Sequence, residues 1–457
     1  MSLVKNPQLT PMLRRFTFLA PALLAASLAG CVVFHAQPVS PAKTAADFES
    51  RTLNDPGLRD FLRENGRRKS SWNFPSLTLA AFYFHADLAL ADTQVEAAKA
   101  ALISAGERPN PTVSLSPQFA NPVQAGTYGF SFDVPIETAG KRGKRIAQAR
   151  HALTSALANR EAAKWQIRGR VRKNLLDLFA ATGREALLQR QQAGQDEVLK
   201  RTEERAAAGE ASRFEATQSR LLANQTRLLL AEAHKQNVES RVGVADAIGV
   251  ASRALDGVAL DFADFKNAPA PRGIASIRRE ALQKRADILA ALADYATAEA
   301  ALRLEIAKQY PDLHISPGYA FDSGTNKWQT AGISLTLPIL NRNRGPIAEA
   351  EAKRKQAAAK FQALQARAIG EIDRASAGYR AAFEKLRTAG TMFETQEKQF
   401  KSSESLVKAG ETDRLALVSA QVELDVAAVS RLDALVEAQQ SLGALEDAVQ
   451  VPLAESK

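Results

Sequence analysis

The chain has 457 residues, of which 46% are hydrophobic, and 60 Lys and Arg residues against 50 Asp and Glu residues give a net charge of +10. This apolar content is sufficient for a large fold and too high for a disordered chain. The single cysteine excludes a disulfide framework and a cysteine-based zinc site, because each needs at least two thiols. No internal run approaches the ~18 apolar residues of a membrane-spanning helix, which excludes helical transporters and channels. The composition predicts a long, Ala-rich, mainly helical protein.

The first thirty residues have the pattern of a signal peptide. Basic residues precede an apolar stretch at 16–28 that is too short to span a bilayer. The stretch ends in Leu28-Ala29-Gly30-Cys31, which resembles the box at which bacterial lipoproteins are cleaved and lipidated. We therefore expect removal of residues 1–30 and a covalent lipid, such as palmitate, on Cys31. An ordinary secretion signal with an incidental cysteine is the alternative.

The chain repeats itself with an offset of about 200 residues. Residues 111–117 match residues 311–317, and residues 129–136 match residues 332–339. The tripeptide Ala208-Gly209-Glu210 has its counterpart in Ala409-Gly410-Glu411. Landmarks in the same order and at nearly the same spacing predict two structural repeats.

The duplication sets the expected domain boundaries. They are a signal peptide at 1–30, an N-terminal anchor and extension at 31–75, a first repeat at 76–250, a linker at 251–273, a second repeat at 274–451 and a tail at 452–457. The linker is predicted from its prolines and aspartates.

Each repeat has the same order of predicted elements. A helical stretch, at about 77–105 or 274–308, leads to two short strands, a very long helix, a Gly break and a last helix. In the long helices apolar residues recur every three or four positions, which predicts one buried helical face. Residues 144–207 would span roughly 96 Å as one helix. A fibrous spacer is the alternative that this periodicity leaves open.

The last predicted helix keeps a heptad phase, which favours helices paired as coiled coils. Asp425 interrupts this phase. The apolar residues expected on the buried face are Leu415, Val418, Val422, Val429, Leu432 and Val436.

Two β-hairpins are predicted, at 112–136 and 312–339, where apolar residues alternate with small polar ones. Such strands suit a membrane barrel with its apolar face toward lipid and its polar face toward a lumen. Four strands cannot close a barrel, and open edges in lipid leave backbone groups unpaired. Several copies are therefore expected to pool their strands, and three copies give twelve strands with room for a lumen. A small water-soluble sheet that caps a helical rod is the alternative.

With these features the chain resembles the TolC-type outer-membrane efflux family, in particular the outer-membrane lipoprotein component of cobalt-zinc-cadmium type heavy-metal efflux pumps. The residues that carry the likeness are 105–111 before the first strand, Gly140-Lys141-Arg142 after the second, 337–345 in the second half, and 208–214 with its copy 409–415.

The resemblance implies a fold class: mainly α with a small membrane β part. Duplicated long coiled-coil helical hairpins and two β-hairpins per chain would form a trimeric α-barrel tunnel and a 12-stranded β-barrel. It also implies a homotrimer in the bacterial outer membrane, lipid-anchored and extending into the periplasm. The expected partners are a periplasmic adaptor (membrane fusion) protein, an inner-membrane resistance-nodulation-division pump and outer-membrane lipid, without nucleic acid.

By this resemblance the two Gly breaks are periplasmic tips that bind the adaptor. The residues assigned to them are Gly209, Glu210, Ser212, Arg213, Gly410, Glu411, Asp413 and Arg414. A purely structural alternative is that these residues only cap helices: the glycines would end one helix, and Ser212 or Asp413 would cap the next. The acidic pair that narrows the tunnel in well-known members is missing, because Ala416 and Ser419 occupy those positions. Glu215, Glu411 and Asp413 are the alternative candidates for a tunnel gate, with ordinary solvated charges as the competing explanation.

Basic residues follow each predicted hairpin and are expected at a barrel–helix junction near anionic lipid. They are Lys141, Arg142, Lys144, Arg145, Arg342 and Arg344. The five histidines lack metal-ligand spacing, so no metal site is predicted and a metal substrate would be passed on. His314 is expected on the lumen face as a lone polar residue. No set of residues indicates an enzyme.

The leading interpretation is a passive exit duct of a tripartite efflux system. The alternatives are an outer-membrane-anchored coiled-coil lipoprotein without a pore and the adaptor of the same pump. Heavy-metal cations are the expected substrate, and small organic drugs are the competing class.

Overall fold

The computed structural model describes residues 32–66, 71–118, 127–271, 274–322 and 325–453. The chain divides into a unit that ends at Ser50 and a unit that begins at Arg51. In the first unit the described residues contain the helix α2 (Pro41–Ser50). The predicted signal peptide and the predicted lipidation site, Cys31, lie outside the described residues.

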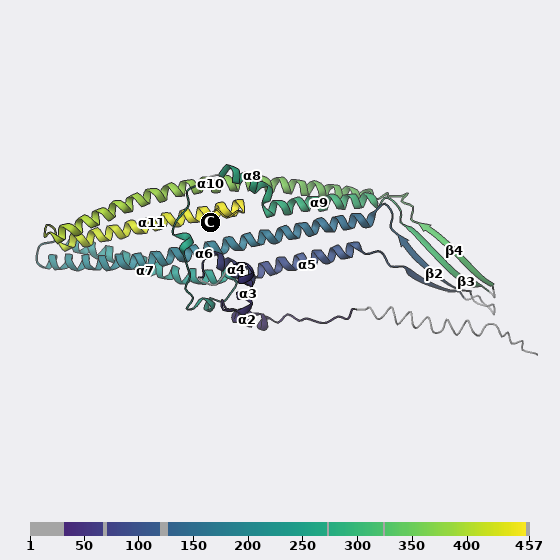
Figure 1. Ribbon diagram of the computed structural model, residues 1–457, viewed down its shortest axis with the longest axis horizontal. Helices are drawn as coiled ribbons and strands as arrows, with labels where there is room; N and C mark the ends of the chain where they lie inside the picture. The colour runs from purple at the N-terminus through teal and green to yellow at the C-terminus, as the bar shows by residue number, and fades with distance from the viewer. Residues whose placement is uncertain (1–31, 67–70, 119–126, 272–273, 323–324, 454–457) are drawn as a thin grey trace, which may run out of the picture. The chain divides into compact units, whose positions relative to one another are not determined.

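The second unit has the same order of elements in its two halves. The first half contains α3 (Pro56–Glu64), α4 (Phe74–Phe84), α5 (Ala86–Gly106), β1 (Thr112–Gln118), β2 (Thr127–Ile136), α6 (Lys141–Ala207) and α7 (Arg213–Ile248). Two 3₁₀ turns follow, η1 (Ser252–Leu255) and η2 (Ala263–Phe265). The second half contains α8 (Ile274–Lys284), α9 (Ala286–Ala307), β3 (Leu313–Asp322), β4 (Thr325–Leu335), α10 (Arg344–Lys408) and α11 (Arg414–Val449). Within this unit the strands lie at one end of the long helices, and the α6–α7 and α10–α11 turns lie at the other (Figure 1).

The two longest helices are continuous, as the periodicity predicted. α6 has 67 residues and α10 has 65. The expected stripe on α6 is buried at Ile167, Val171 and Leu175. In the described part of the chain, no helix carries an apolar stretch long enough to cross a membrane.

The helical stretches before the strands are each broken once, contrary to the expectation of single helices at 77–105 and 274–308. His85 separates α4 from α5 and Arg285 separates α8 from α9, with ψ angles of 126° and 130°. Side chains stabilise both breaks: His85 Nδ1 accepts the Asp87 N–H at 3.1 Å, and Arg285 donates to the Ala448 carbonyl at 2.7 Å. A break of one residue leaves the apolar periodicity of the sequence almost unchanged. The periodicity therefore did not predict these two helix breaks.

The four strands form one antiparallel sheet in the order β1-β2-β3-β4. The two hairpins therefore meet through β2 and β3, where Phe130 pairs with Tyr319. The second hairpin is shorter than predicted, because β4 ends at Leu335 rather than at residue 339. At the other end of the hairpin, the β3–β4 ladder reaches the pair Asp322 and Thr325. The β3–β4 register shifts between Ser316 and Gly318, at a proline that cannot donate to the ladder.

The predicted linker and part of the predicted extension belong to the hydrophobic core. Leu255 and Phe265, from η1 and η2, are fully buried, as is Leu58 of α3. They pack with residues of α4, α6 and α7. Arg172 of α6 is buried among them, and its guanidinium lies 5.5 Å from the centre of the Phe265 ring. The segments called a linker and an extension thus hold the middle of the second unit together.

The buried face of α11 differs from the predicted one. Of the six large residues expected there, Val422 is the one that the structure buries. The buried positions include Ala420, Ala427 and Ala434, which are seven residues apart. α11 packs against both α10 and α6, so small side chains allow the close approach of two neighbours.

Candidate functional site

The two Gly breaks are matching helix-to-helix turns. After α6, the Gly209 N–H donates to the Ala206 carbonyl at 3.2 Å and the Glu210 N–H donates to the Arg205 carbonyl at 2.8 Å. The turn after α10 has the same pair of bonds, from Gly410 to Val407 at 3.1 Å and from Glu411 to Leu406 at 2.9 Å. Both glycines have a φ of 77°. This is the Schellman motif, in which glycine takes the left-handed conformation.

The residues after each turn cap the next helix. The Ser212 hydroxyl accepts the Glu215 N–H at 3.1 Å, and the Glu215 carboxylate accepts the Ser212 N–H at 3.2 Å. Asp413 accepts the Ala416 N–H at 2.8 Å. Two of the three predicted gate residues, Glu215 and Asp413, therefore serve as helix caps in this structure. Their role as a gate stays a prediction.

The tips present charge and one aromatic ring to solvent. Glu210, Arg213, Glu411, Asp413 and Arg414 are exposed. Phe214 at the start of α7 is 76% exposed. The tips thus expose both charged groups and an apolar ring, and contact with an adaptor stays a prediction.

Basic residues hold the strand ends to the helices at the predicted junction. Lys141 is buried, and its ammonium donates to the Tyr310 carbonyl and to Asp312, both at 2.7 Å. Desolvation raises the pKa of Asp312, but the bonds from Lys141 and from the Thr138 N–H outweigh it and leave the pKa lowered. Arg145 pairs with Glu137. Lys141 and Arg145 therefore act inside the chain, across the two halves and between strand and helix.

The remaining basic residues of the junction lie at the starts of the long helices. Arg142 donates to the Gly106 carbonyl at 2.6 Å and Lys144 to the Ala139 carbonyl at 2.7 Å. Arg342 and Arg344 flank the start of α10, where Arg342 has a φ of 48°. Contact of these residues with lipid stays a prediction.

The apolar face of the sheet is exposed in a single chain. Leu115 is 76% exposed, Ile333 67%, and Phe132 44%. β1 and β4 end the strand order, so each has one edge without a strand neighbour in this sheet. An exposed apolar face with two open edges is what strands need if they are to join those of other copies.

The polar face holds a cluster that sequence reasoning missed. His314 of β3 is not the lone residue expected, because its Nδ1 lies 2.8 Å from Asp133 Oδ2. Ser316 donates to Asp133 Oδ1 at 2.9 Å. Asp133 and His314 lie 181 residues apart, so only the β2–β3 pairing brings them together. In the residues that the structure describes, no group of three or more His, Cys, Asp and Glu side chains is placed to hold a metal ion.

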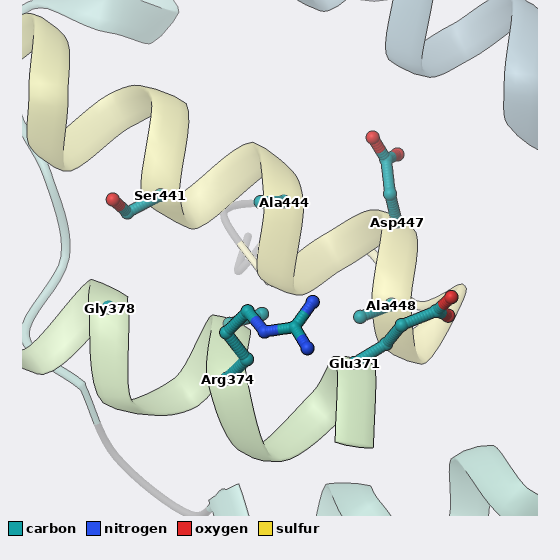
Figure 2. Close-up of a pocket in the computed structure, with 8 residues that line it drawn as sticks. Glu371, Arg374, Gly378, Ser441, Ala444, Asp447 and Ala448 are labelled. Atoms are coloured by element: carbon teal, nitrogen blue, oxygen red, sulfur yellow. The ribbon is translucent and has the colours of Figure 1, made fainter. Parts of the chain in front are cut away.

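A hollow of about 530 Å³ lies between α10 and α11. Figure 2 shows Arg374 in the gap between the two helices, with small residues such as Ala444 and Gly378 around it. The Asp447 carboxylate points away from Arg374 in this view. The charged groups do not converge on one point, so we assign no ligand to this hollow.

Long helical hairpins, one antiparallel sheet with an exposed apolar face, and two matching helix turns define a class of mainly helical protein with a small β part. The family model described as "Outer membrane efflux protein" matches residues 70–250 and 277–449. The chain belongs to this family. Its members are channels and not enzymes.

Two curated relatives are similar over part of their length. The cobalt-zinc-cadmium resistance protein CzcC of Cupriavidus metallidurans is 25% identical over 266 residues, which are 57% of this chain and 62% of the relative. The pyoverdine export outer membrane protein OpmQ of Pseudomonas aeruginosa is 27% identical over 232 residues, 49% of this chain and 48% of the relative. The chain thus spans less than two thirds of either relative.

The fold matches solved structures. The outer membrane protein VceC of Vibrio cholerae has a TM-score of 0.67 at 19% identity, and the match covers 82% of this chain and 95% of that one. This likeness confirms the predicted mainly helical, TolC-like fold of the chain.

Proposed function

We propose that the protein is the outer-membrane exit duct of a tripartite efflux system and passively conducts substrate from pump and adaptor to the exterior. The observation that carries the proposal is the four-stranded sheet, which exposes its apolar face and ends in two open edges, within a chain of the outer membrane efflux family. Strands of this kind are satisfied in a bilayer when copies close a barrel. Three copies supply twelve strands and leave a lumen.

The remaining parts of the chain have matching roles in this proposal. The turns at Gly209 and Gly410 are the periplasmic tips, where Glu210, Ser212, Arg213, Glu411, Asp413 and Arg414 meet a periplasmic adaptor coupled to an inner-membrane pump. Residues 1–30 are a cleaved signal peptide, and Cys31 carries the lipid that anchors the chain. The repeats at 76–250 and 274–451 supply equivalent hairpins, which is supported by the helix breaks at His85 and Arg285, 200 residues apart.

Heavy-metal cations are the proposed substrate. Support comes from the likeness to a cobalt-zinc-cadmium resistance protein. The likeness to a pyoverdine export protein supports the competing class, small organic molecules. A passive duct conducts whatever substrate the pump delivers. The same channel lining is therefore compatible with heavy-metal cations and with small organic molecules.

Single-channel recording of the purified, lipidated protein in planar bilayers tests the duct, with the mass in detergent measured alongside. We expect steady conductance from a species of three chains. A monomer without conductance would leave an anchored coiled coil without a pore as the better explanation. Substrate class is tested separately, by comparing the metal and drug tolerance of cells that lack the protein with that of complemented cells.

A further inference from the structure

The strand pairing builds a polar row across the sheet. In the β2–β3 ladder Pro135 lies opposite His314, which places Asp133 opposite Ser316. On the other side of β3, His314 lies opposite Ser334 of β4, and on the other side of β2, Asp133 lies opposite Thr112 of β1. Because side chains alternate along a strand, Leu313 and Ile315 point to the opposite, apolar face. Two adjacent levels of the polar face, taken together here as the polar row, thus carry an imidazole, a carboxylate and hydroxyl groups.

The hydrogen bonds within this row orient the imidazole. His314 Nδ1 lies 2.8 Å from Asp133 Oδ2, and an ionised carboxylate can only accept a hydrogen bond, so Nδ1 is the donor when Asp133 is ionised. The Ser316 hydroxyl donates to the second oxygen of the same carboxylate at 2.9 Å. In a neutral imidazole the other nitrogen, Nε2, then keeps its lone pair. A histidine that donates to a carboxylate while its second nitrogen stays available is the usual arrangement of a metal-ligating histidine.

The row is open to solvent in the single chain and lies beside a hollow. The side chains of His314 and Asp133 are 35% and 32% exposed. His314 lines a hollow of about 550 Å³ together with Tyr310, Asp312 and Asn341. Lys141, which also lines it, is paired with Asp312 at 2.7 Å. The positive charge of Lys141 at this hollow is thus offset by the Asp312 carboxylate.

We propose that His314 Nε2 is a coordination point for a borderline transition-metal cation on the polar face of the sheet, oriented by Asp133 and Ser316. Imidazole suits Zn²⁺, Ni²⁺ and Cu²⁺, whereas it is a poor ligand for Mg²⁺ and Ca²⁺. One imidazole with water in the other positions holds such an ion weakly, which fits a cation that is passed on. This inference rests on the proposed duct, because the polar face meets cations only if it lines the conducting path.

The chain contains a matched control. His234 of α7 lies 2.9 Å from Glu185 of α6 through Nδ1, and Asn237 donates to the same carboxylate. The His234 side chain is 69% exposed on the helical surface, far along the chain from the strands. The His234–Glu185 pair thus has the same histidine–carboxylate geometry as His314 and Asp133, but it does not lie on the polar face of the sheet.

The test is single-channel conductance with Ni²⁺ added in steps at one fixed pH. We expect reversible Ni²⁺ block of the wild-type protein, relieved by chelator and absent with Mg²⁺. H314Q should abolish the block, D133N should raise the blocking concentration about 10- to 100-fold, and H234Q should leave it unchanged. Conductance without metal shows that each variant has assembled.

The outcomes separate the two proposals. Steady conductance with the same Ni²⁺ sensitivity in wild type and H314Q would overturn the coordination site and leave the duct intact. Block that depends on His314 but not on Asp133 would overturn the orienting role of the carboxylate. The absence of any conductance in the wild type would overturn the proposed function and this inference with it.

Discussion

At the scale of single residues, the two turn glycines determine how the long helices reverse. Gly209 and Gly410 both have a φ of 77°, and an added Cβ would contact nothing within 4 Å. Replacing either glycine with alanine therefore strains the backbone without creating a steric clash. The change in stability then reports the free-energy cost of the left-handed conformation alone. A left-handed conformation costs a residue with a side chain about 1–2 kcal/mol.

We expect G410A to loosen the α10–α11 turn by that amount. Hydrogen–deuterium exchange should rise by about 5- to 30-fold for the amides of Gly410 and Glu411, which close the turn. G390A is the control, because Gly390 lies inside α10 and its Cβ also meets nothing. That substitution should stabilise α10 by about 0.5–1 kcal/mol. Equal exchange in both variants would contradict the assigned motif.

The residue scale also shows what sequence can and cannot provide. The repeated Ala-Gly-Glu was enough to place both turns, because a Schellman turn is encoded within a few adjacent residues. The His314–Asp133 pair was not accessible in this way, since neither residue has a local pattern that indicates the other. Lys141 was expected near lipid, and its burial against Tyr310 and Asp312 depends on a partner about 170 residues away.

At the scale of elements, α11 shows how packing against two neighbours changes a predicted face. Asp425 was considered an interruption of the heptad, but it lies on the buried face of α11, 1% exposed. Arg190 of α6 is 3.0 Å away and 61% exposed. Burial raises the pKa of Asp425, and the interactions with Gln421 and Arg190 lower it less. A raised pKa means that ionisation of Asp425 opposes folding.

The pH dependence of stability follows from this direction. For an aspartate with a raised folded pKa, the stabilising contribution is complete below the ordinary value and is lost as pH rises through the folded value. We expect D425L to be more stable than the wild type at pH 7, by about 1 kcal/mol, because a buried charge is replaced by an apolar group. The difference should shrink when the pH falls below the pKa of Asp425.

Thermal unfolding followed by circular dichroism at several pH values measures this difference. D433L is the matched control, because Asp433 lies on the same helix and pairs with Arg184 of α6, yet is 43% exposed. It should change stability by less than about 1 kcal/mol at every pH. Destabilisation by D425L at pH 7 would show that the pair with Arg190 outweighs the burial of the charge.

Element boundaries were predicted where a residue type enforces them and were wrong where tertiary contacts decide. The end of α6 and the start of α7 follow from Gly209 and Ser212. The break at Arg285 depends on a distant part of the chain, the Ala448 carbonyl, whereas the bond that His85 makes with Asp87 is local. The core role of Phe265 depends on Phe74 and Phe179, which no local pattern connects to it.

At the scale of the whole molecule, apolar surface remains uncovered along α7. Leu221 is 57% exposed and Leu228 is 73% exposed, seven residues apart and thus on the same helical face. Phe214 at 76% continues this row toward the tip. In the proposed assembly this row packs against another copy, which would account for large apolar side chains facing water in one chain.

We therefore expect L221Q/L228Q to weaken the association of copies while the single chain still folds. Covering a leucine contributes about 1.5–3 kcal/mol, so the double variant should dissociate at concentrations at least 100-fold above those at which the wild type does. Light scattering in detergent measures the mass, and circular dichroism checks that helix content is retained. M392Q is the control, because Met392 of α10 is also exposed, at 43%, but lies outside this row. An assembly that tolerates L221Q/L228Q as well as M392Q would show that α7 faces lipid, solvent or another partner, and that the copies meet through other elements.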